Sequence, residues 1–145
     1  MTPSARMFTI HHDARGRLGV LAPKGAPYVY FTTLFPGICK AWHRHQKQTD
    51  RMSCVSGMVR IVALAPNQPP KESTFAIVQV ISGERAPMLI TIPPGWWHGI
   101  QELTGVHDAV VVNCPDQVYD AAHPDEERRP WDDPTIPFEW RRRHG

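Results

Sequence analysis

The sequence predicts an all-β domain, built as an antiparallel barrel or as a sandwich of two sheets. Fifteen prolines and ten glycines divide the 145-residue chain into short pieces. These pieces are rich in β-branched and aromatic residues, and no long stretch places apolar residues at helical spacing. Short strands separated by turn residues are typical of sandwiches and barrels.

The expected strands follow one another through the first 113 residues, with turn signals between them. They cover residues 7–10, 28–35, 52–55, 59–65, 75–81, 88–92 and 107–113. Ser56 and Gly57 predict a tight hairpin, and residues 66–71 and 82–84 predict two further turns. Pro93, Pro94 and Gly95 end a strand, because proline cannot donate to a central ladder.

The composition changes after Cys114, where prolines and acidic residues become frequent. We expect an irregular arm laid over the barrel, with one short helix near residues 125–129. Trp131, Phe138 and Trp140 predict that the arm is docked, because these side chains are costly to leave in water. The sequence therefore predicts one domain over residues 1–145, with a barrel at about 7–114 and an arm at about 115–145.

Charge and cysteine content narrow the classes of partner. The net charge is +2 and the basic residues are dispersed, except for residues 141–143, so we expect neither nucleic acid nor a membrane surface as partner. No apolar run reaches the length of a membrane span, and residues 1–10 do not resemble a signal peptide. Three cysteines without close pairing indicate a reducing, cytoplasmic location.

Two segments carry the residues with catalytic or metal-binding chemistry. His43 and His45 are two positions apart, so both would face the same side of a strand, and a hairpin could return Asp50 beside them. His98 follows the Pro93–Gly95 turn and could converge on them if the chain closes into a barrel. Taken singly, the His-x-His pair fits two solvated side chains, and the second segment fits a plain turn.

The combined spacing resembles the two signature motifs of the cupin superfamily. Gly37, His43, His45, Asp50 and Gly57 match the first motif, with aspartate in place of its glutamate. The second motif is matched by Pro93, Gly95 and His98, although the glycine expected six positions before Pro93 is Pro87. The resemblance implies a cupin-type double-stranded β-helix, that is, a jelly-roll barrel.

Within that superfamily the chain resembles the RmlC-like cupins of the dTDP-4-dehydrorhamnose 3,5-epimerase family. The likeness extends over residues 37–140 and is closest to a divergent, epimerase-related subgroup. It rests on four stretches: residues 40–43, 54–57, 92–99, and 131–134 with the downstream Trp140. Trp42-His43-x-His45 followed by Gln48-Thr49-Asp50, and the Pro124-Asp125-Glu126 arm, mark the subgroup.

The resemblance implies roles for individual residues. His43 would be the base that removes a proton next to a sugar ketone, Asp133 would orient it, and Tyr119 would be the acid. Lys40 would hold the diphosphate of a nucleotide sugar. The remaining candidate substrate-binding residues are His98, Trp42, Trp97 and Arg51. An ordinary turn at Asp133 and a packed surface aromatic at Tyr119 are the structural alternatives.

Two positions depart from the epimerase pattern. Asp50 stands where the family has a lysine that stabilises the enolate oxygen, which reverses the charge at that place. The family's neutral residue two positions after the base is His45 here. The substrate-binding scaffold is retained, and both departures add metal-binding groups.

Three functions therefore follow from the sequence. The first is a cofactor-free, epimerase-like enzyme that uses His43 on a sugar nucleotide or a similar small molecule. The second is a metal-dependent isomerase, cyclase or oxygenase in which His43, His45, Asp50 and His98 hold Fe, Mn, Ni or Zn. The third is a small-molecule-binding protein without turnover. Trp42, Trp96 and Trp97 would line the pocket or pack in the core. We also expect a homodimer, because an open barrel of short strands leaves sheet edges that a second copy can cover.

Overall fold

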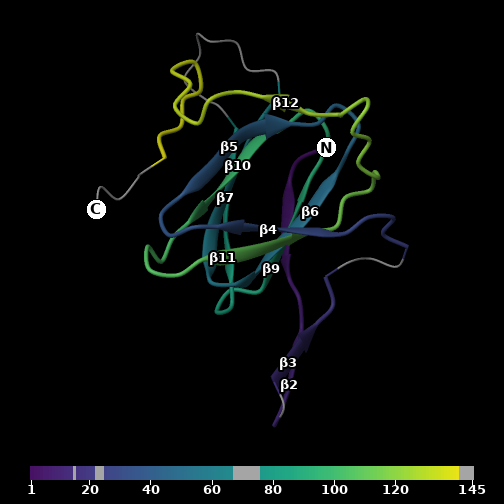
Figure 1. Cartoon of the computed structure of the whole chain (residues 1–145), viewed down its shortest axis with the longest axis vertical. Coiled ribbons are helices and arrows are strands. Elements are labelled where there is room, and N and C mark those ends of the chain that lie inside the picture. Colours follow the sequence, from purple (N-terminus) through teal and green to yellow (C-terminus); the bar gives the residue numbers. More distant parts are fainter. Residues whose placement is uncertain (15, 22–24, 67–75, 141–145) are drawn as a thin grey trace.

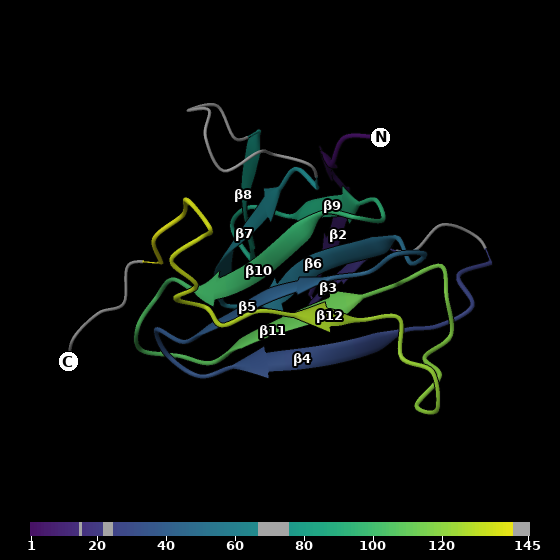
Figure 2. The same ribbon diagram turned by 90° about the horizontal axis from the view of Figure 1, so that it is seen from above.

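The computed structural model describes residues 1–14, 16–21, 25–66 and 76–140, and it contains two antiparallel sheets that face each other (Figure 2). The first sheet has the order β1 (Ser4–Met7), β9 (Met88–Ile92), β6 (Asp50–Ser56), β11 (Ala109–Asn113) and β4 (Tyr30–Leu34). The second has the order β12 (Glu127–Arg128), β5 (Cys39–Arg44), β10 (Trp97–Glu102), β7 (Met58–Leu64) and β8 (Ile77–Gly83). This confirms the predicted all-β, cupin-type jelly roll.

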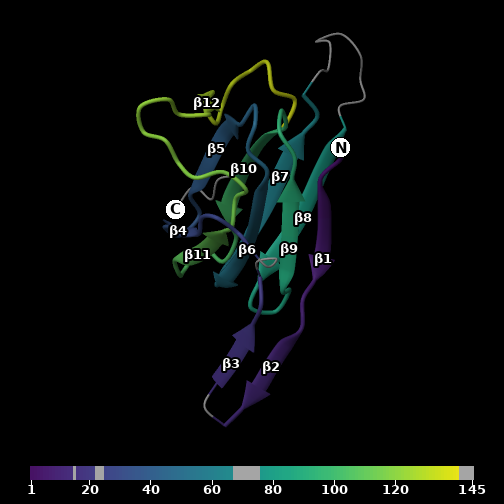
Figure 3. The ribbon, with the colours of Figure 1, turned by 90° about the vertical axis from the view of Figure 1, so that its right-hand side faces the viewer.

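A separate hairpin, β2 (Ile10–Asp13) and β3 (Gly16–Gly19), projects away from the two sheets (Figures 1 and 3). It follows β1, which pairs with β9 along the edge of the first sheet. The strand expected at residues 7–10 is wrong, because this stretch links β1 to the hairpin. None of the described segments forms a helix with the length and hydropathy needed to cross a bilayer.

Strand β7 is buried on both faces, which shows how the molecule is layered. Val59, Ile61 and Ala63 point into the core between the sheets, as expected from alternation along a strand. Val62 and Leu64 point to the other side, where they join a second apolar cluster. That cluster includes Trp42, Trp97, Ile136 and Trp140, so the C-terminal arm covers the outer face of the second sheet. The predicted docking of the arm is confirmed.

The arm also departs from prediction. The short helix expected near residues 125–129 is wrong, since this stretch contains β12, which pairs with β5 in the register Glu127 to Arg44 and Arg128 to His43. Trp42 and Arg129 exchange two backbone hydrogen bonds of 2.9 Å. The exposed edge of β5 offers unpaired backbone groups, and pairing with them outweighs a local helical preference.

Most strand positions follow the sequence prediction, and β9 coincides with residues 88–92. The strand predicted at residues 75–81 corresponds to β8, and its first position, 75, lies outside the described residues. Strand β10 was missed, because all six of its residues are buried and it therefore has no polar alternation. This strand carries His98, so one strand that forms the site was not predicted.

Candidate functional site

Four side chains converge where β5, β6 and β10 meet. His43 is in β5, His45 follows that strand, Asp50 begins β6 and His98 is in β10. One nitrogen or oxygen from each lies within 4.8 Å of the others. His43 and His98 are paired across neighbouring strands, and their ring centroids are 4.0 Å apart. The structure thus brings together all four residues of the predicted cluster.

Asp50 is the centre of this cluster and is fully buried. Its Oδ1 accepts hydrogen bonds from Gln48 Nε2 at 2.7 Å and from Asn113 Nδ2 at 2.8 Å. Its Oδ2 lies 2.9 Å from His98 Nε2 and 3.3 Å from His45 Nε2. Burial by itself raises the pKa of Asp50, but the contacts with His45 and His98 outweigh it and hold the pKa well below 3.8. Asp50 is therefore a carboxylate surrounded by donors.

Two backbone carbonyls orient the rings that face Asp50. His98 Nδ1 lies 2.9 Å from the carbonyl oxygen of Trp96, and His45 Nδ1 contacts the carbonyl oxygen of Asp125. Because carbonyl oxygens only accept, Nδ1 carries a hydrogen in both rings, and each Nε2 is directed at Asp50. The contact with Asp50 raises the pKa of His45 to about 9, against the lowering effect of its burial.

A turn with positive φ joins the two histidine segments. Gly95 has φ of 86°, which favours glycine, and its N–H donates to the carbonyl oxygen of His45 at 2.7 Å. The predicted Pro93–Gly95 turn therefore does more than end β9. It holds the loop that follows β5 beside the start of β10.

His43 has a different environment from the other two histidines. No hydrogen bond of its ring is found among the described residues, and it packs edge-on against the rings of His45 and His98. Burial, together with the nearby His98, lowers the pKa of His43 well below 6.5. His43 is thus neutral at neutral pH and able to accept a proton.

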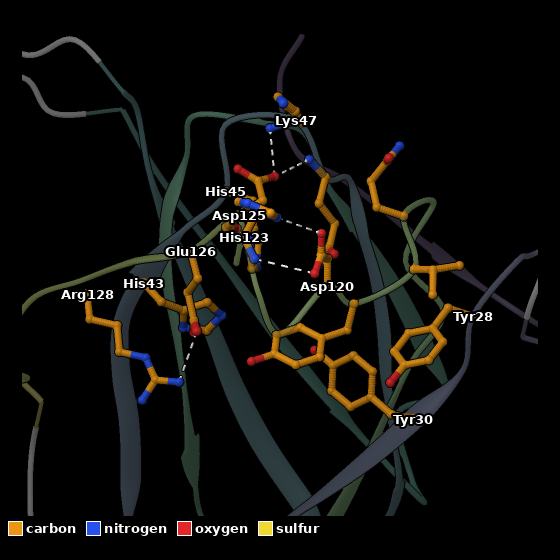
Figure 4. Close-up of a pocket in the computed structure, with 14 residues that line it drawn as sticks. Tyr28, Tyr30, His43, His45, Lys47, Asp120, His123, Asp125, Glu126 and Arg128 are labelled. Atoms are coloured by element: carbon orange, nitrogen blue, oxygen red, sulfur yellow. Dashed lines mark hydrogen bonds and ion pairs between the residues drawn. The ribbon is translucent and has the colours of Figure 1, made fainter.

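Two cavities meet at His43. The larger, of about 670 Å³, is shown in Figure 4. It is lined by Tyr28, Tyr30, His43, His45, Lys47, Gln48, Gln117, Val118, Tyr119, Asp120, His123, Asp125, Glu126 and Arg128. The smaller, of about 520 Å³, is lined by Tyr30, Thr32, Lys40, Ala41, Trp42, His43, Met52, Ile100, Val111, Asn113, Glu126, Arg128 and Arg129.

The charges on the smaller cavity are mostly positive. Lys40, Arg128 and Arg129 line it, against the single carboxylate of Glu126. Lys40 Nζ donates to Thr32 Oγ1 at 2.7 Å, which holds this predicted residue against the opposite sheet. Trp42, also predicted, lines the cavity and packs against Phe138 and Trp140.

The predicted hydrogen bond between His43 and Asp133 is wrong. Asp133 Oδ1 accepts from the backbone N and the hydroxyl of Thr135, at 2.8 and 2.6 Å, and Oδ2 lies 3.8 Å from Arg129 NH1. Asp133 stabilises its own turn, because a carboxylate so close to backbone N–H groups is satisfied locally. The arm delivers other residues to His43 instead.

Other predicted residues lie at varied distances from the cluster. Tyr119 lines the larger cavity and is 59% exposed. Trp97 is buried between the guanidinium groups of Arg44 and Arg129, at 4.6 and 4.7 Å, and does not line either cavity. Arg51 reaches toward the carbonyl oxygen of Cys114 and does not line them either. Trp96 is in the core and donates to the carbonyl oxygen of Met1 at 3.1 Å.

Sequence reasoning missed several residues that the structure adds to the site: Tyr30, Asn113, Asp125, Glu126 and Arg128. Asp125 and Glu126 belong to the Pro-Asp-Glu stretch that was singled out, but only as a mark of resemblance. Nothing in the local sequence of Tyr30 or Asn113 distinguishes them from ordinary strand residues.

The chain is similar to several known proteins. Residues 11–127 match the family described as polysaccharide biosynthesis C-terminal domain. A probable low-salt glycan biosynthesis epimerase from Haloferax volcanii is 33% identical over 77% of this chain and 70% of its own. A spore coat polysaccharide biosynthesis protein from Bacillus subtilis is 36% identical over 73% of this chain and 69% of its own.

A solved structure is also similar. The dTDP sugar isomerase from Desulfovibrio desulfuricans G20 superimposes with a TM-score of 0.83 at 27% identity, covering 95% of this chain and 90% of its own. Fold and site together define an epimerase-like cupin. The chain belongs to the polysaccharide biosynthesis C-terminal domain family.

Proposed function

We propose that this protein is an enzyme that epimerises or isomerises a keto-sugar linked to a nucleotide diphosphate, with His43 as the general base. The observation that carries this proposal is the neutral, half-buried ring of His43 at the junction of two cavities. Relatives named as a glycan biosynthesis epimerase and a dTDP sugar isomerase support the substrate class.

The chemistry needs one base beside a carbon next to a ketone. The His43 ring takes the proton from that carbon, and the C–H electron pair moves to form an enolate on the ketone oxygen. Asp50 cannot stabilise an enolate, because it is itself a buried anion. Arg128, which lines both cavities beside His43, is the cation that we assign to the enolate oxygen. Lys40 and Arg129 would face the diphosphate in the smaller cavity.

Solvent-deuterium exchange with TDP-4-keto-6-deoxyglucose as probe tests this proposal. The wild-type protein in D₂O should place deuterium at a carbon next to the ketone, and His43→Asn should lower the rate by about 10²–10⁴-fold. Ile81→Val, at an exposed position of β8 that lines neither cavity, serves as a folding control. Binding of the probe without any exchange would instead favour the third function, a non-catalytic binding protein.

A second candidate is a metal-dependent enzyme, and the donor geometry favours it. Two ligands about 2.1 Å from one ion lie roughly 3.0–3.4 Å apart, and the Asp50 Oδ2 to His98 and His45 separations are 2.9 and 3.3 Å. The Nδ1–H groups of both rings are bonded to carbonyls, as is common for ligating histidines. His43, His45, Asp50 and His98 would hold Fe, Mn, Ni or Zn, which would supply a Lewis acid.

Our proposal remains the cofactor-free enzyme, because Gln48 and Asn113 already donate to Oδ1 of Asp50 and the protonated ring of His45 faces its Oδ2 at 3.3 Å. Metal analysis of the purified protein and treatment with a chelator separate the two candidates. We expect unchanged exchange rates after chelation. Stoichiometric metal that is lost in Asp50→Ala together with exchange would establish the metal-dependent enzyme.

We also propose that the protein is a cytoplasmic homodimer. Cys39, Cys54 and Cys114 are buried and form no disulfide among the described residues, as expected in a reducing compartment. Strand β4 forms an edge of the first sheet and exposes Phe31, which favours cover by a second copy. Sedimentation at micromolar concentration should give a dimer, and a monomer would contradict this.

A further inference from the structure

Tyr30 and His43 reach the same space from opposite sheets. Tyr30 is in β4 of the first sheet, and His43 is in β5 of the second. Along β4 the inward positions alternate, so that Thr32 lines the smaller cavity and Leu34 is fully buried, while Phe31 is 70% exposed. Tyr30 shares this inward side, and it lines both cavities, as His43 does. Figure 4 shows both side chains in the larger cavity. A sugar ring bound between the sheets would therefore present one face to Tyr30 and the other to His43.

Asn113 orients the hydroxyl of Tyr30. Asn113 Nδ2 donates to Tyr30 Oη at 2.9 Å and to Asp50 Oδ1 at 2.8 Å. The orientation of this amide is fixed, because its Oδ1 accepts from the backbone N of Arg51 at 2.9 Å. Since Tyr30 Oη accepts in this contact, its own hydrogen is left for a ligand.

Tyr30 remains protonated in the neutral range. Burial raises the pKa of Tyr30 above 10, although the hydrogen bond from Asn113 opposes this, and Asp50 adds to the rise. Tyr119, the acid expected from the sequence, is 59% exposed on the arm. Tyr30 is 40% exposed, and Asn113 orients its hydroxyl beside both cavities, which makes it the better placed of the two.

We propose that Tyr30 is the catalytic acid that returns a proton to the sugar carbon, on the face opposite to His43. This inference rests on the proposed function. His43 removes the proton and becomes an imidazolium, and the enolate forms. Tyr30 then donates its O–H hydrogen to the carbon, the carbon–carbon double bond electrons form the new C–H bond, and the ketone is restored. The phenolate regains a proton from water and His43 releases one, so the overall step is proton-neutral.

Tyr30→Phe separates the two proton transfers. In D₂O with TDP-4-keto-6-deoxyglucose, the variant should still place deuterium in recovered substrate, because His43 can return a solvent-derived deuteron to the face it took the proton from. Formation of the epimer should fall by about 10²–10⁴-fold. Ile81→Val, at an exposed position of β8 that lines neither cavity, should retain both activities. A fluorinated tyrosine at position 30, with its lower pKa, should move the alkaline limit of epimer formation to lower pH.

Three outcomes would count against these ideas in distinguishable ways. Epimer formation by Tyr30→Phe within about threefold of the wild-type rate would overturn the role of Tyr30. Exchange without epimer formation in Tyr119→Phe, and not in Tyr30→Phe, would assign the role to Tyr119. Absence of exchange in the wild-type protein would refute the proposed function itself.

Discussion

His98 Nε2 and Asp50 Oδ2 lie 2.9 Å apart, although 48 positions separate the two residues in the sequence. The contact joins the two sheets, because Asp50 begins β6 in the first and His98 is in β10 of the second. Asn113 and Gln48 complete the ring of donors around the carboxylate. The buried carboxylate of Asp50 therefore stabilises the fold and holds His45 and His98 in place.

We expect Asp50→Asn to destabilise the protein by about 3–5 kcal/mol, because the buried donors around it lose their anionic partner. Urea unfolding at pH 7 measures this. Asp133→Asn is the matched control, with a much smaller expected loss, since Asp133 bonds to the neighbouring Thr135 and lies near Arg129 on the surface of its own turn. Equal losses for the two variants would contradict the central role of Asp50.

The stability should depend on pH through His45. The folded-state pKa of His45 is about 9, above the unfolded value near 6.5, because of its contact with Asp50. A raised pKa gives a stabilisation that is complete below pH 6.5 and is lost as pH rises to 9. We expect a fall of roughly 3 kcal/mol at most over that interval.

The control for this dependence is His45→Gln, which has no titrating group at that position. The difference in unfolding free energy between wild type and variant should narrow as pH rises from 6.5 to 9. A constant difference across this range would show that His45 does not carry the effect.

The rate of deuterium exchange should have its acidic limit below pH 6.5. His43 acts only when it is neutral, and burial next to His98 lowers its pKa well below 6.5. We therefore expect a flat profile between pH 6.5 and 8, measured as the initial exchange rate with the probe. A titration centred above pH 7 would mean that another group is the base.

Asp125 should hold the arm onto the site. Its carboxylate accepts from the backbone N–H groups of Gln46, Lys47 and Gln48, each at 2.9 Å. Asp125→Ala should cost about 1–3 kcal/mol and accelerate proteolysis of the arm, as followed by mass spectrometry. The matched control is Asp120→Ala, because within the described part of the chain Asp120 bonds only to the nearby Ala122 and His123. Equal rates of cleavage in Asp125→Ala and Asp120→Ala would argue against a role of Asp125 in holding the arm.

Local chemistry explains what could be predicted. The residues 88–92 form a strand because β-branched and apolar residues fill them, and the Pro93–Gly95 turn ends that strand. The spacing of His43, His45, Asp50 and His98 was sufficient to predict their convergence. Local chemistry did not reveal β10, because burial of both faces removes the alternation that marks a strand.

The sequence by itself determined the all-β class, the cupin resemblance and the four clustered residues, because strand alternation and turn chemistry act over a few positions. Only the tertiary structure decided that β12 pairs with β5, that Asp133 bonds to Thr135 rather than His43, and that Tyr30 and His43 line the same two cavities. These relationships depend on which edges and cavities are left open once the two sheets have packed. No local spacing encodes that, because the partners lie on separate elements that only the folded chain brings together.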